Sequence, residues 1–193
     1  MDQGGRSGVA AIGYLSVVTD PRHGLFGGYL IVNSSGRPLE FHCTAPVRAN
    51  RAQEILYGPT LRDFLYGEHI GRTLVERGET VPDLFCTDSI PMLALRPSIS
   101  KPLALVLAEH ELPEAKVSQL SRVHEVHANA PYEKVLTARN CRVTCASTHP
   151  DDLTAIDRLL PDFDNLDLAE PFERIYAAIE EAHGPTRPEN EAA

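Results

Sequence analysis

Histidine and cysteine side chains that lie close together in the sequence are the first candidates for chemistry. His42 and Cys43 are neighbours in a segment whose apolar residues alternate with polar ones, as in a strand. Successive strand residues point to opposite faces, so His42 cannot act as a base for Cys43. A nucleophilic Cys43 would need a histidine from elsewhere in the chain, and the sequence selects none.

A second group of metal-binding residue types follows later in the chain. His124 and His127 have the spacing of two imidazoles on one helical face, with Glu125 between them. A zinc site needs at least one more ligand at a recognisable spacing, and none is apparent. Cys141 and Cys145 would lie about 13 Å apart on a strand, too far for a disulfide. We interpret the histidines as polar surface and the two cysteines as buried packing.

Arginines are concentrated between Arg48 and Arg77, where five of them alternate with acidic residues. Arginine forms paired hydrogen bonds with phosphate oxygens. One interpretation is therefore a groove for a phosphate backbone, with Arg48 and Arg51 as the phosphate-binding residues. The alternative is a solvated helix face whose opposite charges pair with each other.

Charge is unevenly distributed along the 193 residues, whose formal net charge is -9. Residues 1–149 hold 15 Lys and Arg against 15 Asp and Glu, whereas residues 150–193 hold 3 against 12. The net charge therefore describes the C-terminal segment and does not exclude nucleic acid as a partner of the rest. The hydrophobic content of 42% is that of a globular protein. No apolar run approaches the roughly 20 residues of a membrane helix.

Local patterns predict three strands and then a helix. Residues 10–19, 28–33 and 38–44 read as strands separated by turns, and we expect an antiparallel meander. In the third strand, Leu39, Phe41 and Cys43 should face the covered side. Helical spacing follows from residue 46 to Gly78, with Ala52, Ile55 and Leu56 on its apolar face and a break at Gly58-Pro59.

The second half begins with a short buried strand at residues 83–88 and a short helix that Ser89 caps. Residues 102–108 are continuously apolar, as in a strand buried on both faces. Residues 109–131 are polar and partly helical, and residues 132–146 form one strand or two. Two helices follow, at residues 151–160 and 171–183, with Leu153, Ile156, Phe172, Ile175, Tyr176 and Ile179 among their inward residues.

This β-β-β-α-β-α-β order resembles the ribonuclease H-like fold over about residues 14–109. The first strand ends in Thr19-Asp20, and the fourth ends in Thr87-Asp88. Glu54 lies in the first turn of the helix that opens with N-R-A-Q-E, similar to the asparagine-rich start and helix carboxylate of that family. The predicted fold class is α/β, with a mixed sheet and a helical C-terminal extension.

The resemblance implies a metal-dependent phosphodiesterase or nuclease. Asp20, Glu54 and Asp88 would be its catalytic residues and the ligands of two Mg²⁺ or Mn²⁺ ions. Such ions activate a water molecule and neutralise charge on the leaving oxygen, and they prefer carboxylate oxygens. A fourth carboxylate has no clear match: neither Glu109 and Glu111 nor Asp151 and Asp152 stand in a family motif.

The alternative function is a non-catalytic interaction or scaffold module, because many proteins of one fold serve binding alone. It would be a degenerate ribonuclease H-like domain or a roadblock- or longin-like one, with a protein partner on its sheet or acidic C-terminal helices. The predicted organisation is a flexible N-terminus (1–9), an α/β core (10–149), an acidic helical extension packed on it (150–184) and a disordered tail (185–193). Four cysteines without a C-x-x-C pair favour a reducing, cytoplasmic location. The sequence leaves the oligomeric state open.

Overall fold

The computed structural model describes residues 10–107, 123–125, 134–138 and 141–183. The predicted N-terminal arm and C-terminal tail, and most of residues 109–131, lie outside the described residues. So does His127 of the histidine pair, and His124 lies in a strand rather than on a helix.

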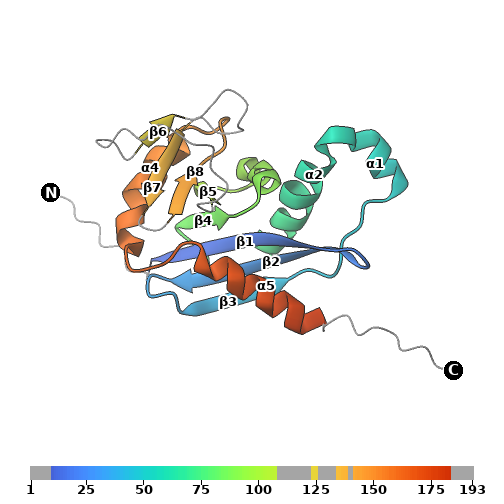
Figure 1. The fold of residues 1–193 in the computed structure, drawn as a ribbon, viewed down its shortest axis with the longest axis horizontal. Coiled ribbons are helices and arrows are strands. Elements are labelled where there is room, and N and C mark those ends of the chain that lie inside the picture. The colour runs from blue at the N-terminus through green and yellow to red at the C-terminus, as the bar shows by residue number, and fades with distance from the viewer. Residues whose placement is uncertain (1–9, 108–122, 126–133, 139–140, 184–193) are drawn as a thin grey trace.

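A mixed eight-stranded sheet forms the centre of the molecule, with the strand order β3-β2-β1-β4-β5-β8-β7-β6 (Figure 1). The first three strands form the predicted antiparallel meander, β4 and β5 run parallel to β1, and β8, β7 and β6 return antiparallel. The strands are β1 Ala11–Asp20, β2 Gly24–Asn33, β3 Pro38–Cys43, β4 Leu84–Thr87, β5 Leu103–Leu107, β6 Val123–Glu125, β7 Lys134–Ala138 and β8 Cys141–Thr144.

Helical segments provide the crossovers between the parallel strands, as parallel pairing requires. The break at Gly58-Pro59 is a short 3-10 turn, and the apolar segment after it winds as a π-helix. The segments are α1 Arg51–Tyr57, η1 Gly58–Thr60, α2 Leu61–Asp63, η2 Phe64–Gly71, α3 Arg72–Val75, η3 Ile90–Ser98, α4 Asp151–Leu159, η5 Leu160–Phe163 and α5 Glu170–His183.

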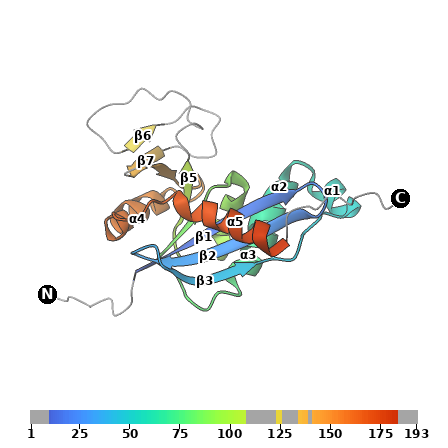
Figure 2. The same ribbon diagram turned by 60° about the horizontal axis from the view of Figure 1, so that its bottom comes forward.

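Apolar layers cover both faces of the sheet. On one face α5 lies across β1 and β2 (Figure 2). Its Phe172, Ile175 and Ile179 pack against a core that includes Tyr14 of β1. On the other face η2 and α3 contribute Leu65, Ile70 and Leu74. β5 is buried along its whole length, as predicted. The acidic C-terminal helices are therefore part of the core rather than a detachable appendage.

Two adjacent glycines let the two layers approach β2 closely. A Cβ atom on Gly28 would lie 2.3 Å from Cγ2 of Ile175 in α5. A Cβ atom on Gly27 would lie 2.2 Å from Cγ2 of Ile70 on the opposite face. Neighbouring strand residues point to opposite faces. Gly27 and Gly28 therefore each allow a helical segment to pack closely on the sheet, one on each face.

The first helix differs from its prediction. Ala52, Ile55 and Leu56 were expected to face the core, but α1 buries none of its residues, and Ile55 and Leu56 are 66% and 82% exposed. The cause is the Gly58-Pro59 break: Gly58 adopts a positive φ of 50°, so the chain changes direction before the segment that covers the sheet.

The remaining differences are local. Residues 132–146 form two paired strands, β7 and β8. Leu39 and Phe41 of β3 are 46% and 39% exposed rather than covered. Tyr176 of α5, expected among the inward residues, is 41% exposed. No helix among the described residues is long and apolar enough to cross a bilayer.

Candidate functional site at the ends of β1 and β4

The parallel register of β1 and β4 decides which residues meet at the end of β4. Leu15 is paired with Thr87, so the next residues along, Ser16 and Asp88, stand opposite each other. Asp20 is four residues farther along β1, about 13 Å at the usual rise of a strand. The predicted pair of strand-end carboxylates is thus separated along the sheet, and a hydroxyl takes the place beside Asp88.

Two hydroxyl groups hydrogen-bond the carboxylate of Asp88. The buried Ser16 donates its Oγ–H to Oδ1 at 2.8 Å, and Tyr176 of α5 donates its hydroxyl to Oδ2. Ser16 Oγ also lies 3.2 Å from the Tyr176 hydroxyl. This Ser16–Asp88–Tyr176 cluster joins β1, the end of β4 and the C-terminal helix.

Asp20 closes the turn between β1 and β2. Its Oδ1 accepts the backbone N–H groups of Arg22 at 2.8 Å and His23 at 2.7 Å, and it lies 3.0 Å from Nδ1 of His23. The hydrogen bond from the His23 backbone, above all, lowers the pKa of Asp20. These contacts are those of an Asx-type turn.

Glu54 lies on the exposed helix α1. Its Oε2 pairs with Arg51 Nη1 at 3.0 Å, and both side chains are largely solvent-exposed. Asn50 caps the helix through a capping box with Gln53. The asparagine-rich start therefore has a structural role in beginning α1.

The described residues do not fit a two-metal centre. No group of three or more His, Cys, Asp or Glu side chains suited to a metal ion occurs among them. Asp88 is surrounded by hydroxyls, Asp20 lies in a turn and Glu54 is on an exposed helix. Two-metal chemistry needs several carboxylates that converge on one position. The described residues do not form such a cluster, and binding of Mg²⁺ or Mn²⁺ stays a prediction. Glu109 and Glu111 lie outside the described residues.

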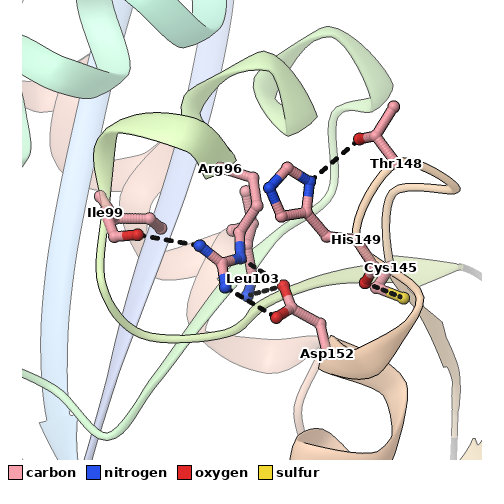
Figure 3. A network of polar contacts seen from close by, with 7 residues as sticks. All are labelled: Arg96, Ile99, Leu103, Cys145, Thr148, His149 and Asp152. Carbon is pink, nitrogen blue, oxygen red and sulfur yellow. Dashed lines mark hydrogen bonds and ion pairs between the residues drawn. The ribbon is translucent and has the colours of Figure 1, made fainter.

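Asp152, considered as a further carboxylate, has a structural partner (Figure 3). Its two oxygens accept Nε and Nη2 of Arg96 in a buried bidentate ion pair, with the Nη2 contact at 2.8 Å. Arg96 Nη1 also donates to the carbonyl of Ile99 at 2.8 Å, and the N–H of Leu103 lies 3.3 Å from Asp152 Oδ2. This network fastens α4 to η3 and β5.

His42 and Cys43 point to opposite faces, as predicted. His42 Nε2 lies 3.1 Å from Glu40 and its ring stacks on Tyr29, whereas Cys43 packs against the core under α5. Cys141 and Cys145 are buried free thiols. Burial raises the pKa of Cys141 to about 11, which disfavours its thiolate.

Four exposed arginines lie in the β1–β2 turn, in the segment after β3, and in α1 and α2. Arg48 donates its Nε–H to the carbonyl of His23 at 2.9 Å, which brings it next to the turn that carries Arg22. Arg51 begins α1, and the guanidinium of Arg62 lies 5.5 Å from the Tyr66 ring centre. Among the described residues, only Arg51 of the four forms an ion pair. We call this set, Arg22, Arg48, Arg51 and Arg62, the arginine edge.

Sequence reasoning selected Arg48 and Arg51 as phosphate-binding residues and counted Arg62 in the same arginine-rich segment, but it missed Arg22, which lies in an earlier predicted turn. It also missed Ser16 and Tyr176. A signal for Ser16 exists, because this small polar residue interrupts the apolar run of its strand. No such signal exists for Tyr176, because its position in the helix is the one expected of a buried apolar residue.

The order and pairing of strands define a ribonuclease H-like α/β fold. A solved structure of a variant of endonuclease V from Ciona intestinalis, in complex with a 23mer DNA containing an inosine followed by a ribo-adenosine, matches with a TM-score of 0.52 and 9% identity, over 92% of this chain and 88% of that one. A second complex of that enzyme, with a 24mer DNA, gives 0.49 at 9% identity, over 92% and 89%. Human endonuclease V gives 0.45 at 9%, over 92% and 87%. No family model and no curated protein matches the sequence.

Proposed function

We propose that this chain is a ribonuclease H-like domain that binds nucleic acid through its arginine edge and does not hydrolyse it with Asp20, Glu54 and Asp88. The observation that carries the proposal is the Ser16–Asp88–Tyr176 cluster: two hydroxyls, not carboxylates, hydrogen-bond the acid at the end of β4. A hydroxyl pair supplies none of the negative charge that two divalent ions need, and each Asp88 oxygen already accepts one hydrogen bond from it.

Local charge supports nucleic acid as the partner. Three arginines of the edge form no ion pair with a described acid, and all three are exposed: Arg22 lies in the β1–β2 turn, Arg48 in the segment before α1, and Arg62 in α2. The endonuclease V structure with which this fold aligns contains DNA. Guanidinium groups bind phosphates and release counterions, which makes such binding strongly dependent on salt.

Arg22→Gln is expected to weaken binding of a fluorescent duplex and a fluorescent single strand alike, because a phosphate contact is independent of sequence. Fluorescence anisotropy across a salt series measures the slope of the log of the association constant against the log of the salt concentration. The magnitude of that slope should decrease by about one for each phosphate contact removed. Arg158→Gln on the exposed face of α4 is the matched control and should leave the slope unchanged. Equal losses in both variants, or no binding by the wild type at low salt, would refute the arginine edge.

The metal-dependent nuclease prediction is tested separately with Asp88→Asn. We expect wild-type protein and Asp88→Asn, purified side by side, to give the same cleavage of a mixed DNA and RNA panel with Mg²⁺ or Mn²⁺. Melting temperatures establish that both are folded. Metal-dependent cleavage by the wild type that disappears in Asp88→Asn would make Asp88 catalytic and overturn the non-hydrolytic part of the proposal.

A further inference from the structure

The segment between β3 and η2 exposes apolar side chains to solvent. In α1, Ile55 and Leu56 are 66% and 82% exposed. Tyr57, at the end of α1, is half-buried, and among the described residues none of these three belongs to the apolar core on either face of the sheet. We call residues 50–64, which contain α1, η1 and α2, the helical arm. In Figure 1 it is the teal segment at one end of the molecule that carries the labels α1 and α2.

Three aromatic rings are nearly parallel where the helical arm joins η2. The ring centres of Tyr57 and Phe64 lie 4.0 Å apart with 17° between their planes, and those of Phe64 and His69 lie 6.1 Å apart, also at 17°. Phe64 packs against the core, so the ring stacked on it, Tyr57, is held in place. A Cβ atom on Gly58 would meet no atom within 4 Å, so nothing packs on the chain directly after Tyr57. The arm thus holds a ring in a fixed orientation at an open surface.

The charges of the helical arm favour an anionic partner. Arg48, just before the arm, and Arg62 in α2 are exposed, and neither forms an ion pair with a described acid. The arm contains two acidic residues, Glu54 and Asp63, and Glu54 pairs with Arg51. Apolar and aromatic side chains between unpaired arginines are typical of surfaces that bind single strands, where cations contact the phosphates and rings stack on the bases.

We propose that the helical arm binds single-stranded nucleic acid, with Tyr57 stacking on an unpaired base and Arg48 and Arg62 contacting phosphates along the strand. This inference rests on the proposed function and adds the strand state of the ligand. A duplex keeps its bases inside the stack, so it can use the arginines but not Tyr57. An anionic bilayer would also accept Ile55 and Leu56, but its binding scales with apolar area, of which the seven residues of α1 provide little, and it makes no use of parallel rings.

Tyr57→Ala is expected to weaken binding of a fluorescent oligothymidine by about fivefold or more, the usual effect of removing one stacked base contact, and to leave binding of a duplex unchanged. Tyr57→Phe keeps the ring and should bind like the wild type, whereas Tyr57→Leu keeps apolar bulk and should bind like Tyr57→Ala. Fluorescence anisotropy at low salt measures binding, and melting temperatures establish folding. Equal effects on both ligands, or none, overturn this inference and leave the arginine edge standing. A wild type that binds neither ligand refutes the proposed function and this inference with it.

A spectroscopic reporter tests the stacking contact without a loss of ring area. The chain contains no tryptophan, so Tyr57→Trp places a single indole on the helical arm. Its fluorescence should fall on addition of oligothymidine and stay constant with duplex, because a base stacked on the indole quenches its emission. Leu39→Trp is the matched control at an exposed site of β3, outside the arm, and should not respond. A blue shift of the Tyr57→Trp emission with phosphatidylserine vesicles, without quenching by oligothymidine, would assign the arm to a lipid surface and overturn the proposal.

Discussion

Asp152→Ala is expected to lower the free energy of unfolding by about 3 to 5 kcal/mol, because it leaves the Arg96 guanidinium charged and without its partner in a largely buried position. Arg96 is held between the Asp152 carboxylate and the Ile99 carbonyl, and hydrogen bonding to Asp152 raises the pKa of Arg96. The guanidinium of arginine stays protonated in proteins even without such a partner, so Arg96 does not lose its charge to relieve the cost. Urea denaturation followed by circular dichroism measures the change.

Asp151 is the matched control, since it is the neighbouring carboxylate on the same first turn of α4 but is exposed. Asp151→Ala should cost less than about 1 kcal/mol, the usual value of a charge near a helix N-terminus. Replacing both members of the pair, with Arg96→Met and Asp152→Leu, should recover most of the lost stability, because apolar residues of similar volume need no partner. Similar losses in the two alanine variants would show that the ion pair is not what fastens α4.

Gly28→Ala is expected to destabilise the fold by about 2 to 3 kcal/mol, although alanine is only one methyl group larger, because overpacking forces the facing helix to move. The added Cβ would lie 2.3 Å from Cγ2 of Ile175 and 3.0 Å from Cδ1 of Ile179. Moving α5 outward would also draw Tyr176 away from Asp88. Thermal and urea denaturation measure the change in stability.

A double-mutant cycle distinguishes this clash from a general effect of glycine replacement. Ile175→Ala removes the methyl group that the new side chain would meet, so the double variant should be more stable than the sum of the two single effects predicts, by about 0.5 to 3 kcal/mol, the coupling usual for residues in contact. Additive effects would show that α5 does not rest on Gly28.

Much of the fold follows from local patterns along the chain. Alternation in β3, the continuous apolar run of β5 and the helical spacing of α4 and α5 are set by neighbours in sequence, so they predicted those elements. The same kind of pattern gave a wrong prediction for α1, because periodicity shows that a helix has an apolar face but not whether that face is buried. Ile55 and Leu56 have the spacing of a core helix and yet face solvent.

In the candidate site, too, the sequence predicts the elements but not which of their residues come together. The sequence by itself determined that Asp20 and Asp88 follow strands and that Glu54 begins a helix. Only the tertiary structure decided that Ser16, and not Asp20, stands beside Asp88. That choice depends on the register of β1 against β4, two strands separated by more than 60 residues, and packing of both sheet faces sets such a register. Tyr176 also reaches Asp88 through tertiary packing: Gly28 of β2 sets where α5 lies, and no local pattern encodes that contact.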